Sequence, residues 1–302
     1  MAKSIIKTVV LLIISIGVAF LIYLSEENNC DIASIVLSAI IGVSIEQFIL
    51  SFPDLTDVNS WKREQRKYMK GHFICKDTLI RISFAYIFRI KVNGKYLLVM
   101  NSRHTGKYQP VGGVYKMKDS EKQFLAFKYN CMDDDMIPID GSSRNDYRLR
   151  VKNRYLRPFV RRFNKGIGRE VIDNISREFK EELIDTGILS VDKFKQLRYE
   201  YVGRYYNGVK FTQHFGCYEL LLGDVVSLIL TPEQEVELQE LLNDKNDNVA
   251  FFTDKQIEKL GVDIDQGDLG EIIADHSLNV LESSADQLEG GLKKGKMYSV
   301  DL

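Results

Sequence analysis

The stretch Arg177-Glu178-Phe179-Lys180-Glu181-Glu182 decides how this 302-residue chain is interpreted. In a helix, Glu178, Glu181 and Glu182 have the spacing i, i+3 and i+4, which places three carboxylates on one face. Such a face is favourable when water surrounds it or when a hard cation collects the charges. Mg²⁺ prefers oxygen ligands and is commonly shared with substrate phosphates. A plain, solvated glutamate face is the alternative interpretation of this spacing.

The residues around this stretch predict the elements of an α+β domain. An apolar stripe predicts a helix over about 170–183, and it is formed by Ile172, Ile175, Phe179 and Leu183. Asn93-Gly94 and Asn207-Gly208 each separate two apolar and aromatic runs, which is a strong hairpin signal. The predicted order is therefore hairpin, long insertion, helix, hairpin and further helices, and not the alternation of a parallel doubly wound sheet.

A glycine pair lies upstream of the carboxylates, in the segment Tyr108-Gln109-Pro110-Val111-Gly112-Gly113. Glycines without a Cβ let a ligand or metal approach the backbone closely. This segment is therefore the second candidate part of a binding site.

Together these two segments resemble the Nudix family, which pairs a Pro-Gly-Gly strand end with a box of the form Arg-Glu-U-x-Glu-Glu-x-Gly-U, where U is bulky and aliphatic. The resemblance implies a Nudix-like α/β/α sandwich. It also implies possible Mg²⁺ ligation by Glu178, Glu181, Glu182 and the Gly113 carbonyl, with Glu178 as the base if the protein is hydrolytic. The chain departs from the family pattern in four places. Ile184 takes the place of the box glycine and Arg169 that of the leading glutamate. Residues 114–167 separate the two segments, and Val111 separates Pro110 from Gly112.

The insertion 114–167 is basic and aromatic. Residues 144–169 contain ten Lys or Arg and one acid, interleaved with Tyr and Phe. Arginine matches phosphate oxygens, and aromatic rings stack on bases. The candidate ligand-binding residues are Tyr108, Gln109, Arg154, Tyr155, Arg157, Arg161 and Arg162. Contact with anionic lipid, or with the acidic residues 231–302, is the alternative for this basic region.

The first 57 residues contain two apolar runs, at about 5–24 and 32–52, joined by a short acidic loop. Twenty residues of helix match a hydrocarbon core of about 30 Å, so the sequence predicts a transmembrane hairpin. A cleaved signal peptide is the alternative for the first run. Basic residues precede the first run and continue in a juxtamembrane connector over 58–77. This charge pattern predicts a multi-pass inner-membrane protein with both termini in the cytoplasm.

The second apolar run carries a stripe of small and polar residues at i, i+4, i+8 and i+12: Ser34, Ser38, Gly42 and Glu46. Small residues let helices approach closely. The stripe predicts either packing between the two runs or association with other copies of the chain.

The cysteine spacing bears on disulfides and metal sites. The four cysteines show no metal or disulfide spacing, so residues 78–302 are expected to form a domain without disulfides. The net charge of the chain is −1.

Two predicted spans followed by a divergent, insertion-bearing Nudix domain resemble the two-transmembrane Nudix effectors of CBASS antiphage systems, which are encoded beside nucleotidyltransferases. The resemblance implies that a cyclic di- or oligonucleotide binds the domain, that the hairpins form a homo-oligomer, and that the lipid bilayer is disrupted. A membrane-anchored, Mg²⁺-dependent pyrophosphohydrolase of nucleoside-diphosphate derivatives is the enzymatic alternative. A noncatalytic membrane scaffold is the third possibility.

Overall fold

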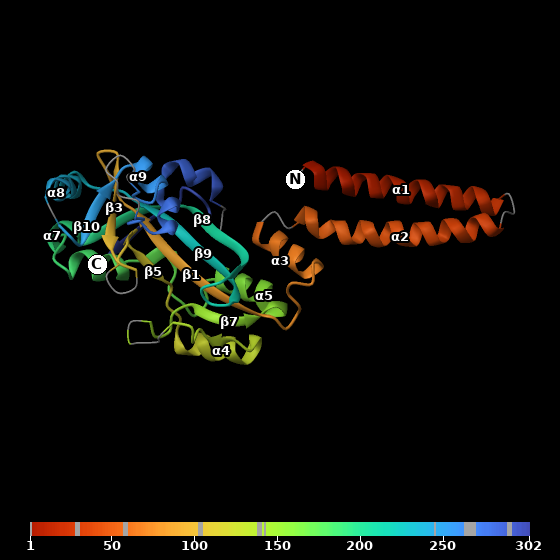
Figure 1. Ribbon diagram of the computed structural model, residues 1–302, viewed down its shortest axis with the longest axis horizontal. Coiled ribbons are helices and arrows are strands. Elements are labelled where there is room, and N and C mark those ends of the chain that lie inside the picture. The colour runs from red at the N-terminus through yellow and green to blue at the C-terminus, as the bar shows by residue number, and fades with distance from the viewer. Residues whose placement is uncertain are drawn as a thin grey trace. The chain divides into compact units, whose positions relative to one another are not determined.

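The computed structural model describes residues 2–27, 31–56, 60–101, 105–137, 141, 143–244, 246–262, 270–288 and 292–302. The chain divides into two compact units, Met1–Phe73 and Ile74–Leu302 (Figure 1).

Three helices are described in the first unit: α1 (Ala2–Glu27), α2 (Asp31–Thr56) and α3 (Ser60–Lys70). Helices α1 and α2 lie side by side, and the hydroxyl groups of Ser15 and Ser44 approach within 3.0 Å in their contact. The Ser34 side chain of the predicted stripe on α2 lies outside the described part of the structure. Ser38, Gly42 and Glu46 are exposed, and no atom lies within 4 Å of the place where a Gly42 Cβ would stand.

None of the helices in the described part of the chain is long and apolar enough to cross a membrane. The expectation of transmembrane helices at about 5–24 and 32–52 is therefore wrong. Both apolar runs do form helices. Apolar composition, however, is shared by membrane spans and by helices that pack against protein, so it cannot separate the two.

The second unit is built on two sheets. The larger has the order β11-β8-β9-β1-β7-β6, with β5 also paired to β1, and only the β1–β9 pair is parallel among the pairs described. Its strands are β1 (Leu79–Arg89), β5 (Gly112–Val114), β6 (Met132–Asp133), β7 (Arg148–Lys152), β8 (Gln196–Thr212), β9 (Cys217–Leu228) and β11 (Met297–Asp301). The smaller sheet has the order β10-β3-β2 with β4 on β3, and contains β2 (Lys91–Val92), β3 (Lys95–Met100), β4 (Tyr108–Gln109) and β10 (Val249–Phe252).

Helices and turns cover these sheets. They are α4 (Asp119–Tyr129), α5 (Asn153–Asn164), the 3₁₀ turn η1 (Ile172–Asn174), α6 (Arg177–Phe179), the π turn η2 (Lys180–Ile184), α7 (Val191–Phe194), α8 (Pro232–Asn243), α9 (Asp254–Glu258), and the 3₁₀ turns η3 (Asp275–Val280) and η4 (Glu282–Gln287). Helix α8 begins with the capping box of Thr231 and Gln234.

Strand β1 separates two layers, because successive side chains point to opposite faces of a sheet. On one face, the Phe84 ring stacks on Phe163 of α5 at 3.6 Å, and Phe88 meets Phe179 of α6 at 5.7 Å between ring centroids. On the other face, Ile87 packs with Tyr96 and Leu98 of the smaller sheet. Helices α5 and α6 therefore share one face, and the smaller sheet lies on the other.

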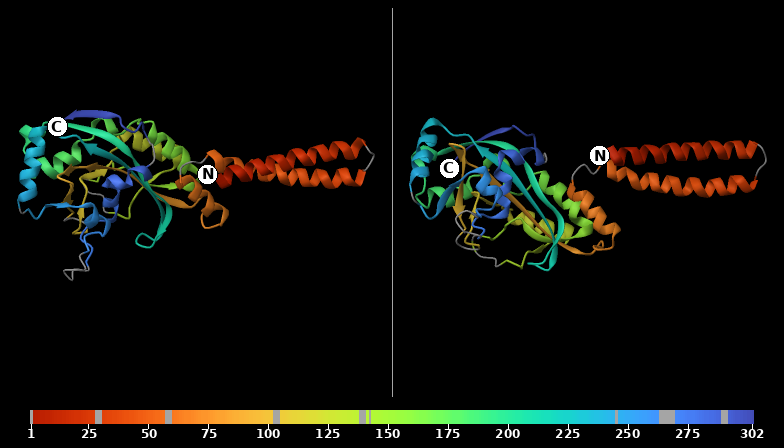
Figure 2. Two further views of the ribbon diagram at one scale, coloured as in Figure 1. Left: turned by 90° about the horizontal axis from the view of Figure 1, so that it is seen from above. Right: turned by 45° about the horizontal axis from the view of Figure 1, so that its top comes forward.

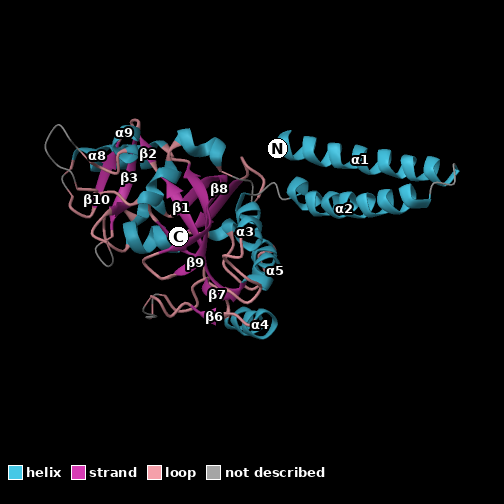
Figure 3. Cartoon of the chain, turned by 45° about the vertical axis from the view of Figure 1, so that its right-hand side comes forward, coloured by secondary structure: helices cyan, strands magenta, loops and turns pink. Residues whose placement is uncertain are grey.

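The insertion 114–167 is part of the large sheet. Strand β7 pairs with the first half of β1, from Leu79↔Lys152 to Ser83↔Arg148, and β6 pairs with β7. Figure 3 shows α5 beside β7 and α4 beside β6. An inserted segment thus supplies two strands and two helices to the domain.

The two predicted hairpins have different outcomes. Asn93 and Gly94 have φ of 48° and 75° and connect β2 to β3 in a tight turn, as predicted. Asn207-Gly208 does not end a strand. Strand β8 continues to Thr212 with a register shift between Asn207 and Lys210, and β8 and β9 run together over most of their length (Figure 2). The Asn-Gly pair instead lies in a β-bulge, where one strand has an extra residue and bends.

Candidate functional site

The glycine pair of β5 lies directly against the carboxylate stretch. A Cβ at Gly113 would stand 2.0 Å from Glu178 Oε1, and a Cβ at Gly112 would stand 2.2 Å from the Tyr86 carbonyl. The Gly112 N–H donates to Glu182 Oε2 at 3.3 Å. The close approach expected of the glycines is therefore made to the protein's own glutamates.

The carboxylates are presented by an irregular helix. Helix α6 covers three residues and passes into the π turn η2, in which the Asp185 N–H donates to the Lys180 carbonyl five residues earlier at 2.8 Å. The continuous helix predicted over about 170–183 is therefore wrong, because Ile172–Asn174 form a separate 3₁₀ turn. All four residues of its apolar stripe are nevertheless buried.

The three carboxylates differ in environment. The Glu178 side chain is 16% exposed and the Glu181 side chain 51% exposed. Burial and, after it, the neighbouring Glu178 carboxylate raise the pKa of Glu182 to about 8. Burial also raises the pKa of Glu178, although Arg177 opposes this. Partial burial therefore makes the charged forms of Glu178 and Glu182 less favourable than in a solvated glutamate.

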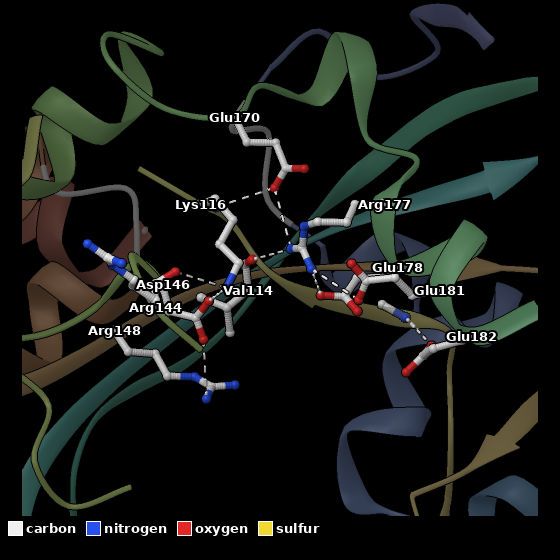
Figure 4. A network of polar contacts seen from close by, with 11 residues as sticks. Val114, Lys116, Arg144, Asp146, Arg148, Glu170, Arg177, Glu178, Glu181 and Glu182 are labelled. Atoms are coloured by element: carbon white, nitrogen blue, oxygen red, sulfur yellow. Dashed lines mark hydrogen bonds and ion pairs between the residues drawn. The ribbon is translucent and has the colours of Figure 1, made fainter. Parts of the chain in front are cut away.

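Arg177 is the cation at the centre of the site (Figure 4). Its Nη2 donates to the Val114 carbonyl at 3.0 Å, and its Nη1 forms a direct ion pair with Glu178. The Glu181 and Glu170 carboxylates lie 3.7 and 3.8 Å from the same guanidinium. Arg177 thus ties β5 to the carboxylates on both sides of it.

Sequence reasoning missed the part that Glu170 takes in this cluster. Glu170 is one residue away from the place of the leading Nudix glutamate. The Lys116 N–H donates to Glu170 Oε2 at 3.3 Å, and the Glu170 N–H donates to the Lys116 carbonyl at 2.8 Å. Gly166 and Gly168, both at φ 68°, shape the loop before Glu170. The positions of these two glycines are the sequence feature that could have indicated an altered loop before Glu170.

The candidate ligand-binding residues fall in two places. Tyr108 and Gln109 form β4 of the smaller sheet. The Tyr108 N–H donates to the Ile272 carbonyl at 2.7 Å, and Gln109 Oε1 accepts from Asn101 at 2.9 Å. The remaining five lie on α5, which covers the opposite face of β1. The structure therefore does not bring the seven residues together.

On α5, the candidates have different surroundings. Arg162 forms two hydrogen bonds, of 2.9 and 2.6 Å, with the buried Glu121 carboxylate of α4. Arg154 is paired with Asp77, and the Tyr155 ring lies 6.1 Å from that of Tyr129. Arg157 is partly buried and Arg161 is exposed.

Magnesium fits the chemistry of the donors but not their arrangement. The carboxylates and the Gly113 backbone are oxygen ligands of the type that Mg²⁺ prefers. Among the residues that the structure describes, however, no three His, Cys, Asp or Glu side chains are grouped so that they would hold a metal ion. Glu178 is paired with Arg177, and the half-exposed Glu181 carboxylate lies 3.7 Å from the same guanidinium.

Comparison with known proteins identifies the family of this domain. The model of the SMODS-associated NUDIX domain matches residues 79–281. A solved NUDIX hydrolase from Nitrosomonas europaea is 12% identical, with 69% of this chain and 91% of that chain covered and a TM-score of 0.30. No curated protein matches the chain. Because the family model spans more than half of the sequence, the chain belongs to the SMODS-associated NUDIX domain family.

Proposed function

We propose that the Nudix domain is a sensor for a cyclic di- or oligonucleotide made by a SMODS-type nucleotidyltransferase in antiviral defence. The family description links the domain to SMODS proteins. We favour a sensor over a hydrolase because of the arrangement of the box. The Glu178 carboxylate is paired with Arg177, and the Glu181 side chain is half exposed. A π turn over Lys180–Ile184 takes the place of regular helix.

The basic helix α5 supports a phosphate-bearing ligand. Arg161 and Lys165 are exposed one turn apart, and Arg157 precedes them on the same side of the helix. Arginine forks bind phosphate oxygens bidentately. We propose that this side of α5 contributes to ligand binding.

The output that we propose is self-association of the chain through α1 and α2, followed by death of the infected cell. Ile13, Phe20, Ile35 and Val43 are each at least 60% exposed on these helices. An apolar surface of this kind favours association, because burying it removes it from water.

The test is titration of the full chain with a panel of cyclic di- and trinucleotides, followed by light scattering. We expect one ligand to bind and to raise the molecular mass. Arg161→Glu should weaken that binding by about tenfold, since it removes one charge-assisted contact and adds a repulsion. Absence of binding across the panel would contradict the proposal.

Hydrolysis remains the second candidate because Glu178 and Glu182 both meet the glycine pair of β5. With Mg²⁺ present, turnover of a nucleoside-diphosphate derivative by the wild type and its loss in Glu182→Gln would favour a pyrophosphohydrolase. Equal turnover in both proteins would count against the box as its origin.

A further inference from the structure

A small pocket lies within the insertion, away from the glutamates of the box. It is bounded by α4, β6 and β7, and its charged lining residues are Lys122, Asp133, Asp134, Asp146 and Arg148. Lys122 pairs with Asp133 at 2.8 Å, which leaves Arg148 as the cation of the lining that faces Asp146. Neither the box nor the basic side of α5 accounts for it.

The Asp146 carboxylate occupies one wall of this pocket between two cations. Lys116 Nζ forms a direct ion pair with Asp146 Oδ1, and Arg148 Nη1 lies 3.4 Å from Oδ2 (Figure 4). The Asp146 side chain is only 10% exposed. Burial nevertheless raises its pKa against the effect of both cations, so the two partners compensate the carboxylate incompletely.

Arg148 has binding capacity left over. A guanidinium carries five N–H donors, and within the described ranges Arg148 makes one long ion pair and no hydrogen bond through them. Lys116 has a further role, since its Nζ lies 3.2 Å from the Arg144 carbonyl and its backbone joins Glu170. Lys116 therefore contacts both Asp146 of the pocket and Glu170 of the carboxylate cluster.

Asp134 presents an unsatisfied acceptor in the lining of the same pocket. Its Oδ2 accepts from Arg81 Nε at 2.7 Å, while its buried Oδ1 has no hydrogen-bond partner among the residues that the structure describes. The Asp134 side chain is 2% exposed. A buried acceptor without a partner is costly, and a hydroxyl or amine donor of a ligand would satisfy it.

We propose that this pocket is a phosphate subsite, in which Asp146 holds the place that a nucleotide phosphate takes between Lys116 and Arg148. A phosphate group brings more oxygens and more charge than a carboxylate, and so it uses the spare donors of Arg148. A ribose hydroxyl or a base amine on the same ligand supplies the donor for Asp134. The inference rests on the proposed function only for the nucleotide nature of the ligand.

Substitutions of the neighbouring residues Asp146 and Arg148 should change the affinity for phosphate in opposite directions. The full chain is titrated with inorganic pyrophosphate and, separately, with adenosine 5′-monophosphate, in chelator and without Mg²⁺, so that the box contributes no metal. Asp146→Asn, which removes the competing charge and keeps the shape, should tighten binding by about tenfold. Arg148→Gln should weaken binding by about the same factor.

Lys128→Gln is the matched control, because Lys128 is an exposed cation on α4 in the same insertion. It should leave binding within about twofold. Arg148→Lys, which keeps the charge but loses the fork, should lie between the wild type and Arg148→Gln. Thermal unfolding checks that each variant is folded. If Asp146→Asn does not fold, the Arg148 variants still test the proposal, because Arg148 is partly exposed.

The two ligands separate the sources of phosphate. Binding of both supports a general phosphate subsite, and stronger binding of the nucleotide supports contact with Asp134. Weaker or unchanged binding in Asp146→Asn, or no binding of either ligand by the wild type and Asp146→Asn, would overturn the proposal. Phosphate binding here without any response to cyclic nucleotides would leave this subsite standing and would contradict the sensor function alone.

Discussion

Gly113 shows how one missing Cβ positions the site. The space of its absent side chain is filled by the Glu178 carboxylate, with Oε1 2.0 Å from the Cβ position. Gly113→Ala should therefore displace Glu178 from Arg177 and destabilise the domain by about 1–3 kcal/mol, as overpacking generally does. Thermal unfolding measures this, with Gly141→Ala as the control because nothing lies within 4 Å of the Gly141 Cβ position. Equal melting temperatures for the two variants would contradict the packing described.

The raised pKa of Glu182 predicts a pH-dependent stability. A carboxyl group with a pKa of about 8 in the folded state and an ordinary value in the unfolded state binds a proton on folding between these two values. Stability should therefore fall as the pH rises from about 4.5 to about 8. In Glu182→Gln this loss of stability should be smaller. The variant should therefore melt at a higher temperature than the wild type at pH 8, and not at pH 4.5.

The measurement is thermal unfolding across this pH range, where each kcal/mol corresponds to about 2–4 °C for a domain of this size. Glu181→Gln serves as the control, because the Glu181 side chain is half exposed. Parallel pH profiles for wild type and Glu182→Gln would show that Glu182 does not titrate as described.

At the scale of elements, helices α4 and α5 depend on one buried ion pair. Glu121 is 2% exposed and accepts both hydrogen bonds of Arg162, and the guanidinium also lies 3.7 Å from the Phe124 ring. Arg162→Met should lower the free energy of unfolding by about 3 kcal/mol, because it leaves the buried Glu121 carboxylate without its charged partner and with only the Tyr147 hydroxyl at 3.3 Å among the described contacts. Its effect is measured by urea unfolding.

The neighbouring variant Arg161→Met controls for loss of charge and helix propensity, since Arg161 is exposed. It should change the unfolding free energy by no more than about 0.5 kcal/mol. A similar loss in both variants would mean that the α4–α5 contact does not depend on Glu121.

The sequence predicts some elements and not others for definite physical reasons. Asn93-Gly94 predicts its turn correctly because the positive φ values that it favours are needed there. The helix over about 170–183 is predicted too long, because the apolar stripe reports burial of Ile172 and Ile175 and not their backbone hydrogen bonds. The resemblance to the Nudix family, and not the spacing of the residues, predicts that Gly113 and Glu178 share one site. Gly166 and Gly168 indicate a turn before Glu170, but they do not specify that the turn brings Glu170 to Lys116.

Across the whole domain, Arg89 connects the large sheet to the C-terminal turns. This guanidinium is 5% exposed and donates to the carbonyl groups of Val280 and Leu281, at the end of η3. Arg89→Met should leave two buried acceptors without donors and destabilise the domain by about 2–4 kcal/mol. Hydrogen exchange should then increase over 275–288 more than over β9.

Lys91→Met provides the comparison, because Lys91 pairs with Glu282 at the surface, where the Glu282 side chain is 61% exposed. Such a pair contributes about 1 kcal/mol or less. Exchange over 275–288 that is no faster in Arg89→Met than in Lys91→Met would contradict a role for the buried guanidinium.

The pairing of β7 with β1 limits how far this domain can be shortened. From the sequence alone, residues 114–167 look removable, because they separate the glycine pair from the carboxylate stretch. Their removal would strip Leu79–Ser83 of its backbone partners on one side, since β9 pairs only with the other side, and would take away the Phe163 ring that stacks on Phe84. Bare strand edges recruit other chains and aggregate. A shorter relative of this protein must therefore close the sheet with a strand from elsewhere, because the inserted segment keeps this edge from pairing with other chains.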